Sequence, residues 1–332
     1  MWKIEYTALL ANILVGSTFI FSGLAKLNDL RSFAHKIEEY LRVLASQLTG
    51  WARLFLPYTV CLALAIATAE VTFGTAVVIY WHRYWTLLSL LLLTLFFTAL
   101  TFYTAISKRI VSCGCFGGAL ELAPWQSFGK SIVLLSLIGV LCWQESSQPV
   151  VAMMSGGGWI VAGALLTALS LGSYTLRYLP VIDWSPYKVG SDLHQHLPPS
   201  PNATLEDPSS STEQFGHAGD SELRIWQGAK DRIRDVLTGN KVLLIVQAPE
   251  ILTTKVLQEL QAFVNNPPSD TQIILLSKAG NGEILAPLLQ LTLYTAQPLL
   301  LQRMLQTSTG ALHLRDGVVV GKWHYRDLKH MA

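Results

Sequence analysis

Charged residues are scarce in this chain. Only 14% of its 332 residues are Asp, Glu, Lys or Arg, while 51% are hydrophobic; an ordinary soluble domain has about a quarter charged residues. Residues 9–21, 54–69 and 87–103 contain no charged side chain at all. With their flanks, such runs are long enough to cross about 30 Å of hydrocarbon. The composition predicts a multi-pass membrane protein with the lipid bilayer as a partner.

Other absences exclude whole classes of function. The chain has no dense cluster of Lys and Arg and a formal net charge of only +2, so we do not expect nucleic acid as a partner. Four cysteines are too few for a disulfide scaffold. His194 and His196 stand in a polar segment without a surrounding ligand set, so we expect no metal. The first apolar stretch lacks a small-residue cleavage site, which favours a retained helix over a removed signal peptide.

Hydropathy predicts five spans. They lie near residues 6–27, 55–80, 85–106, 128–144 and 158–179. The fourth is the weakest because Lys130 shortens its apolar core, and a short buried helix is the alternative. Between the first two spans, residues 33–48 carry apolar side chains at helical spacing. This pattern predicts a helix that lies in the membrane interface or packs on the soluble domain.

Basic residues fall mainly on one side of this topology. One side carries only Lys3 and Arg83. The other carries Lys26, Arg31, Lys36, Arg42, Arg53, Lys108, Arg109, Lys130, Arg177 and Lys188. The positive-inside rule then places the N-terminus outside and the C-terminal domain in the cytoplasm.

The end of the chain has the pattern of a separate soluble domain. We expect a membrane domain at residues 1–190, a Pro/Ser-rich linker at 191–222 and a soluble domain at 223–332. In the last, apolar patterns predict strands near 241–247 and 272–277, helices near 253–264, 283–291 and 298–306, and a final hairpin at 311–323. The order βαβα(α)ββ indicates a small α/β domain.

Two cysteines form the most evident chemical motif. Only Gly114 separates Cys113 from Cys115, in a polar, glycine-rich stretch after the third span. A disulfide across so small a ring is strained and easily reduced, which suits thiol exchange better than scaffolding. The alternative is a tight turn with two buried thiols. Of the other cysteines, Cys61 is expected near the same membrane face and Cys142 near the opposite one.

Glu70 is a carboxylate between long apolar runs of the second span. An ionisable group at that depth is costly and is a functional candidate by default. We expect it inside the bundle, hydrogen-bonded to a polar group on the first or third span. The depth-matched residues are Asn12, Gly16, Ser17, Thr94 and Thr98. We expect Lys26 to extend to the membrane surface rather than to reach Glu70, and a polar clamp without catalytic duty is the alternative role for the carboxylate.

The order of these residues resembles the MauE/DoxX family of bacterial membrane proteins. The likeness rests on residues 21–23 with Lys26, residues 36–40, Glu70 with Gly74, and residues 113–117. Residues 178–183 and 186–190 resemble the five-span branch typical of Bacteroidetes. The resemblance implies a helical bundle in a bacterial inner membrane, linked to redox or assembly of partner proteins. MauE is associated with methylamine dehydrogenase maturation, in which disulfides form in a subunit.

The C-terminal region is similar to thioredoxin-like domains in residues 312–317 and 321–323. A catalytic thioredoxin would carry Cys-x-x-Cys after its first long strand, where this chain has residues 248–251 without cysteine, and a cis-proline where Thr309 and Gly310 stand. No cysteine follows Cys142. The resemblance therefore implies a degenerate thioredoxin-like fold that docks a protein partner.

Three interpretations fit the sequence. The leading one is a thiol-redox or maturation factor that uses Cys113 and Cys115 and recruits a partner through residues 223–332. The second is a non-enzymatic membrane scaffold. The third is a small transporter or a lipid- or quinone-binding protein that uses Glu70, and a polar cavity around Glu70 would favour it. No cofactor is evident from the sequence, with a quinone as the candidate in the third interpretation.

Overall fold

The computed structural model describes residues 2–47, 50–107, 123–146, 157–197, 223–228, 230–247, 253–268, 270–278, 280, 282–283 and 285–331. Within them the prediction of five spans is confirmed. Five helices are long and apolar enough to cross a membrane, at Leu9–Asn28, Ala52–Val78, Arg83–Ile106, Pro124–Gln144 and Gly157–Arg177. The weak fourth span is among them. The chain divides into a helical unit that ends at Arg177 and a second unit that begins at Tyr178.

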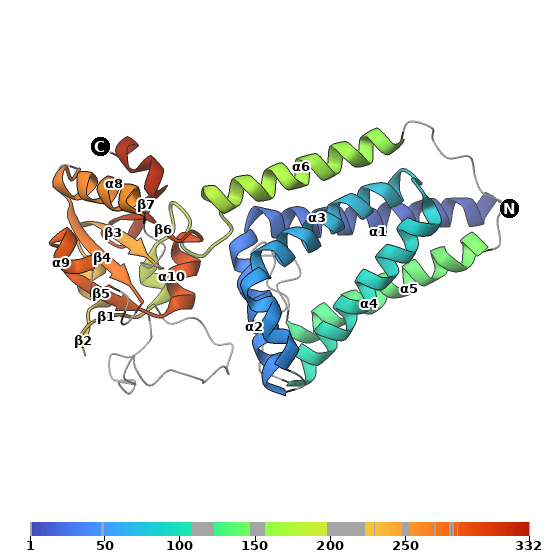
Figure 1. Cartoon of the computed structure of the whole chain (residues 1–332), viewed down its shortest axis with the longest axis horizontal. Helices are drawn as coiled ribbons and strands as arrows, with labels where there is room; N and C mark the ends of the chain where they lie inside the picture. Colours follow the sequence, from blue (N-terminus) through green and yellow to red (C-terminus); the bar gives the residue numbers. More distant parts are fainter. Residues whose placement is uncertain are drawn as a thin grey trace. The chain divides into compact units, whose positions relative to one another are not determined.

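The helical unit is built from two groups of helices. α1 (Trp2–Asn28) packs along α3 (Thr59–Val78), and α6 (Gly157–Arg177) packs on α3 as well. α4 (Arg83–Ser107) and α5 (Pro124–Ser146) form the other pair. Figure 1 shows that this pair diverges from α1 and α3 toward α2 (Leu30–Gln47), which crosses the open end. Large apolar side chains such as Leu10, Leu92 and Leu166 remain exposed on the outer faces, as lipid contact requires.

Glycines allow α1 and α3 to approach each other closely. A Cβ atom on Gly16 would lie 2.7 Å from the carbonyl oxygen of Gly74, and one on Gly74 would lie 2.9 Å from that of Gly16. Small residues at such contacts are typical of helix pairs in membranes, where close backbone packing replaces the hydrophobic drive. This contact fixes the register of α1 against α3.

The helix predicted between the first two spans is present as α2. Its apolar face is buried against the other helices, where Phe33 and Ala34 join a core with Ala63 and Ala67 of α3. A 3-10 helix, η1 (Gly50–Tyr58), leads from α2 toward α3. Near the end of α4, the hydroxyls of Tyr40 and Thr104 are 3.0 Å apart. α2 therefore packs within the helical unit.

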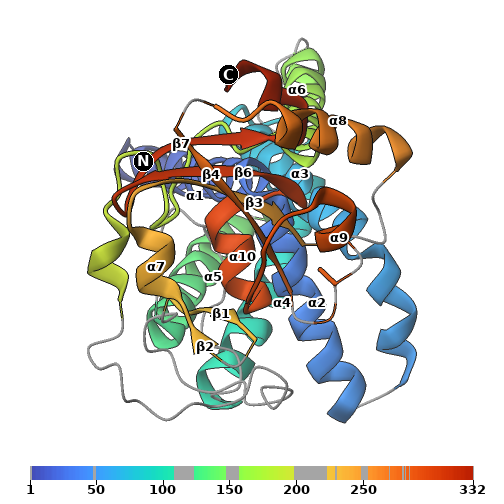
Figure 2. The same cartoon turned by 90° about the vertical axis from the view of Figure 1, so that its left-hand side faces the viewer.

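The second unit contains a mixed sheet of seven strands in the order β2-β1-β5-β4-β3-β6-β7 (Figure 2). Its strands are β1 (Ile225–Gln227), β2 (Lys230–Asp231), β3 (Asn240–Val246), β4 (Gln272–Ser277), β5 (Leu293–Ala296), β6 (Thr309–Arg315) and β7 (Val318–His324). β3, β4 and β5 are parallel, and β6 and β7 continue the sheet in antiparallel pairing.

Helices lie on both faces of this sheet. They are α7 (Ile233–Leu237), α8 (Thr254–Asn265), α9 (Leu285–Leu289), α10 (Pro298–Leu305) and η4 (Tyr325–His330). Side chains alternate along β3, so that Leu243 and Ile245 pack with α7 and α10, whereas Val242 and Leu244 pack with α8 and α9. The predicted strands and helices of this unit are present. The short elements β1, β2, α7 and β5 were not predicted.

Residues 178–197, called the strap below, pack on this sheet. Leu193 and Tyr187 are buried in its core. The backbone N–H of Gly190 donates to the carbonyl oxygen of Val319 at 2.8 Å, and the N–H of Val319 donates to that of Ser191 at 2.9 Å. The strap is tied to β7 and groups with the second unit by its contacts, while the expected domain division at residue 190 stays a prediction. Most of the expected linker, residues 198–222, lies outside the described residues.

Candidate functional site

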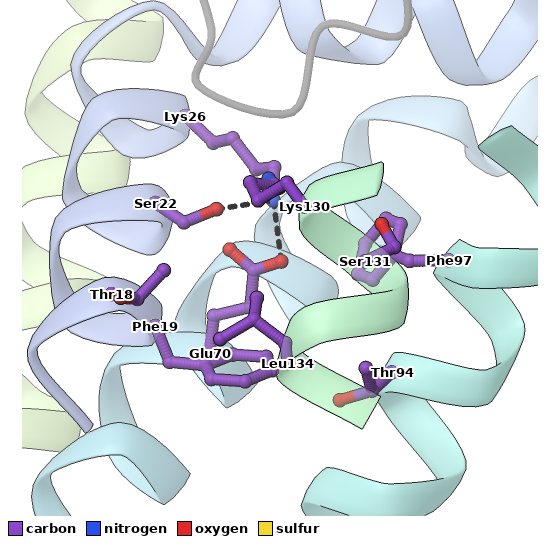
Figure 3. Close-up of a pocket in the computed structure, with 10 residues that line it drawn as sticks. All are labelled: Thr18, Phe19, Ser22, Lys26, Glu70, Thr94, Phe97, Lys130, Ser131 and Leu134. Carbon is purple, nitrogen blue, oxygen red and sulfur yellow. Dashed lines mark hydrogen bonds and ion pairs between the residues drawn. The ribbon is translucent and has the colours of Figure 1, made fainter. Parts of the chain in front are cut away.

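A buried ion pair lies between α1 and α3. The Nζ atom of Lys26 contacts Oε1 of Glu70, and each of the two side chains is only 2% exposed. Figure 3 shows the carboxylate of Glu70 directed toward α1, with Lys26 and Ser22 above it. The prediction that Glu70 faces the bundle interior and bonds to the first span is confirmed.

The expectation that Lys26 extends to the membrane surface is wrong. A side chain on a helix leans toward the helix N-terminus, which for Lys26 means toward Ser22 and the bundle centre. The Lys26 Nζ atom accordingly donates to Ser22 Oγ, one turn earlier, at 3.0 Å. The pairing of Gly16 with Gly74 places Glu70 at the depth of residues near 20. The Lys26 side chain spans the remaining distance along α1 to reach Glu70. A side chain directed to the membrane surface could not do so.

The ammonium of Lys26 is surrounded by groups that stabilise a positive charge. Besides Glu70 and Ser22, it lies 4.7 Å from the ring centre of Phe97 on α4 and 5.3 Å from that of Phe33 on α2. Aromatic faces attract cations at such distances. The ammonium of Lys26 on α1 thus contacts side chains of α2, α3 and α4.

A small cavity adjoins the ion pair. Its volume is about 30 Å³, and about 10–15 Å³ is enough for one water molecule. Oε2 of Glu70 has no hydrogen-bond partner among the described residues. The lining residues are Thr18, Phe19, Ser22, Lys26, Glu70, Thr94, Phe97, Lys130, Ser131 and Leu134. The cavity therefore holds an unsatisfied carboxylate oxygen in space for one or two waters.

The residues matched in depth to Glu70 have other roles. Asn12 donates to the Tyr80 hydroxyl at 2.8 Å, near the other end of the bundle. The hydroxyls of Ser17 and Thr98 bond to carbonyl oxygens of their own helices. Thr94 lines the cavity, although its hydroxyl donates to the Leu90 carbonyl. The depth of Glu70 that was expected from counting residues along the helices is about one turn too near the loop between α3 and α4.

Lys130 is a cavity residue that sequence reasoning did not identify. In the sequence it interrupts the fourth span and is one of the basic residues that set the orientation, but in the structure it lines the cavity from α5 (Figure 3). A lysine early in a weakly apolar span, four residues after Gln126 and one before Ser131, was the available signal. The described charged groups around the cavity are therefore Lys26, Lys130 and Glu70.

Cys113 and Cys115 lie outside the described residues. They belong to the segment that joins Ser107 of α4 to Pro124 of α5. Cys61 is exposed near the start of α3, and Cys142 is half-buried on α5. Among the described residues no group of three or more His, Cys, Asp or Glu is arranged to hold a metal ion. His194 Nδ1 lies 2.8 Å from Asp192 Oδ1 in the strap, and the side chain of His196 lies outside the described ones.

The fold and the site define a multi-pass helical membrane protein with a buried intramembrane ion pair and a mixed-sheet unit. Residues 4–144 match the model of the family described as Methylamine utilisation protein MauE. The match extends from α1 through α5 and includes Lys26, Glu70, Cys113, Cys115 and Lys130. No curated protein and no solved structure matches the chain.

Proposed function

We propose that the chain is a membrane thiol-redox or maturation factor in which Cys113 and Cys115 exchange with the thiols of a partner protein. The observation that carries the proposal is the Cys113-Gly114-Cys115 sequence within the region that matches MauE. In the exchange, a partner thiolate attacks one sulfur of the Cys113–Cys115 disulfide and releases the other as a thiolate. A second partner thiol then resolves the mixed disulfide, which leaves a disulfide in the partner and a dithiol here; in reverse, the same steps let a dithiol here reduce a partner disulfide, and the compartment that the cysteines face sets the direction.

The helical unit supports this proposal through the position of the cysteine segment in the chain. The segment joins α4 to α5, and both helices line the cavity beside Glu70. Thr104 near the end of α4 and Ser127 near the start of α5 are buried hydroxyl residues. The segment that contains the two cysteines therefore joins those ends of α4 and α5 that have buried hydroxyl residues.

In this proposal the second unit recruits the partner. It has no cysteine, so it cannot take part in thiol exchange itself. The degenerate thioredoxin-like fold that the sequence resembles would keep the protein-binding surface of such domains without their reaction. The mixed sheet, with three parallel strands at its centre and an antiparallel hairpin at one edge, is compatible with that fold.

A second candidate function is supported by the cavity itself. A small transporter or a ligand-binding protein would use Glu70 as a proton or ligand group, and the site offers a carboxylate oxygen without a partner among the described residues. The present volume of about 30 Å³ accepts water rather than a quinone ring. This candidate therefore concerns protons or very small polar ligands.

Mixed-disulfide trapping in native membranes tests the thiol proposal. Cys113→Ala or Cys115→Ala removes one of the two sulfurs, so one of these variants should accumulate a disulfide-linked adduct on non-reducing gels. The double variant is the negative control, and Cys61→Ala and Cys142→Ala should behave like the unaltered chain. Alkylation before and after reduction should show that Cys113 and Cys115 change oxidation state together. Two permanently reduced cysteines and no adduct would contradict the proposal and leave the scaffold interpretation.

A further inference from the structure

One oxygen of the buried carboxylate is left open by the ion pair. Glu70 is 1% exposed, and its Oε1 is taken by Lys26, whereas Oε2 has no hydrogen-bond partner in the described part of the chain. A buried acceptor without a donor costs about 1–3 kcal/mol, and more when it is charged. Water in the adjoining cavity would remove that cost, because the space fits one or two molecules and is lined by polar groups.

The interior between α4 and α5 differs on the two sides of this cavity. Toward the start of α5, most of the buried residues are hydroxyl-bearing, namely Thr101, Thr104, Ser127 and Ser131, although Ala105 is buried there as well. Toward the other end most are apolar, with Leu87, Leu90, Ile138 and Leu141 packed against Val15, Phe19 and Val77 in one cluster, although Thr86 and Asn12 are buried there as well. The buried surroundings of the cavity are therefore more polar toward the start of α5 than toward its other end.

Lys130 lies on the polar side. It is half-buried, lines the cavity and stands in the second turn of α5. Long basic side chains commonly reach from an apolar interior to the membrane surface. The Lys26 ammonium contacts Glu70, Ser22 and two aromatic rings, and Lys130 is the other basic residue that lines the cavity, on the side where α5 begins.

We propose that Glu70 is a one-sided proton-exchange site of the membrane, connected through the cavity to the side where α5 begins. A hydronium ion on that route transfers its proton to Oε2, which forms a neutral carboxyl group and leaves one water molecule. The Lys26 ammonium keeps its protons and its contacts with Ser22, Phe33 and Phe97 in this step. The buried charge changes by one, and no cysteine takes part, so this inference goes beyond the thiol proposal and does not depend on it.

Carbodiimide labelling of the full chain in vesicles tests this inference. Dicyclohexylcarbodiimide enters membranes and reacts with protonated carboxyl groups, and mass spectrometry of the peptides locates the adduct. Five spans place the C-terminus on the same side as the start of α5. Vesicles captured intact by a C-terminal tag therefore have that side outside. The pH is then lowered in one compartment at a time.

We expect labelling of Glu70 to rise when the outside pH is lowered, because the carbodiimide reacts with the protonated carboxyl group. It should not respond to the inside pH, and Glu70→Gln should remove the adduct. Lys130→Leu should weaken the response, while Lys36→Leu, on α2 and away from the cavity, should not. Labelling that follows the inside pH, or both sides equally, would overturn the one-sided site. The proposal would also be overturned if Glu70 were labelled in the Lys26→Met variant but not in the wild-type protein. Glu70 would then be a permanently ionised partner of Lys26.

Discussion

The ammonium of Lys26 reaches inward along α1 to Glu70 on α3, and both side chains are almost wholly buried. Either charge alone would be expensive in the interior of a membrane protein. Together with Ser22 and the rings of Phe33 and Phe97 they form one network of contacts. The pair therefore links four helices, α1, α2, α3 and α4.

Loss of one member of this pair should be more harmful than loss of both. Lys26→Met leaves a buried carboxylate without its counterion, and breaking a buried pair in this way costs about 3–5 kcal/mol. The double variant Lys26→Met/Glu70→Leu should recover most of this stability, since no charge is left in the interior. Thermal unfolding in detergent measures the difference. Arg42→Gln, which removes the exposed ion pair with Glu38 on α2, is the control and should change little. Equal stability of Lys26→Met and wild type would show that the pair carries no structural load.

The glycine contact between α1 and α3 gives a second prediction. Gly74→Ala places a methyl group 2.9 Å from the carbonyl oxygen of Gly16. The helices must separate, at a cost of about 1–3 kcal/mol as in other overpacked interiors. Gly139→Ala is the matched control, because nothing lies within 4 Å of its added Cβ on α5. A lowered unfolding temperature for Gly74→Ala alone is expected, and equal values for both variants would be inconsistent with the packing described.

The strap should detach when its ion pair is removed. Lys322 Nζ on β7 lies 2.6 Å from Asp183 Oδ2 and 3.1 Å from Ser185 Oγ. The Lys322 side chain is 5% exposed and that of Asp183 24%. Hydrogen bonds to charged groups of this kind contribute about 1–3 kcal/mol, or roughly 5–150-fold in an opening equilibrium. Lys322→Met should therefore increase proteolysis within residues 178–197, whereas Arg232→Gln, at an exposed pair with Asp235, should not.

His313 should make the second unit less stable in mild acid. Its Nε2 atom lies 2.5 Å from Asn240 Oδ1, and burial, with a smaller contribution from Arg315, lowers the pKa of His313 from its ordinary value of 6.5. Below pH 6.5 the unfolded chain binds a proton at His313 that the folded chain does not bind. Lowering the pH therefore reduces the free energy of unfolding until the pH lies below the folded-state pKa of His313. His313→Gln should flatten this dependence in thermal unfolding of the full chain between pH 7 and about pH 5. A His313→Gln chain with the same pH profile as the unaltered chain would contradict this prediction.

The sequence predicts the helices of this protein better than their contacts. Long charge-free runs leave no other environment than the bilayer, so the five spans were readable from hydropathy alone. The direction of Lys26 was not, because it depends on the lean of the side chain and on acceptors from other helices. Glu70, in contrast, could be identified from the sequence. A lone carboxylate in an apolar run needs a partner, whichever helix supplies it.

The second unit shows the same limit. β1, β2 and β5 have only two to four residues each, too few for an alternating pattern to emerge. Residues 191–197 of the strap were predicted to begin a linker because they are polar, yet Leu193 among them is fully buried in the core of the second unit. Contacts of that kind come from the folded sheet and not from local sequence.

The orientation of the protein in the membrane is the final prediction, and it decides the direction of any thiol exchange. Lys26 and Lys130 line the cavity, so they are set aside from the count of basic residues in the connections. The remaining residues on that side still far outnumber Lys3 and Arg83 on the other. The positive-inside rule therefore places Ala332 in the cytoplasm and the turn at Trp81 outside.

A green fluorescent protein fused after Ala332 should fluoresce, and alkaline phosphatase fused to a chain cut after Trp81 should be active because it is exported. An odd number of spans between the N-terminus and residue 108 puts Cys113 and Cys115 on the same side as Ala332. In the cytoplasm they would face a reducing pool, which keeps thiols reduced and confines disulfides mostly to transient exchange. The pair should then be found as a dithiol at rest and should reduce its partner. The opposite result for both fusions would invert the chain, expose the cysteines to an oxidising compartment, and make the pair a donor of disulfides instead.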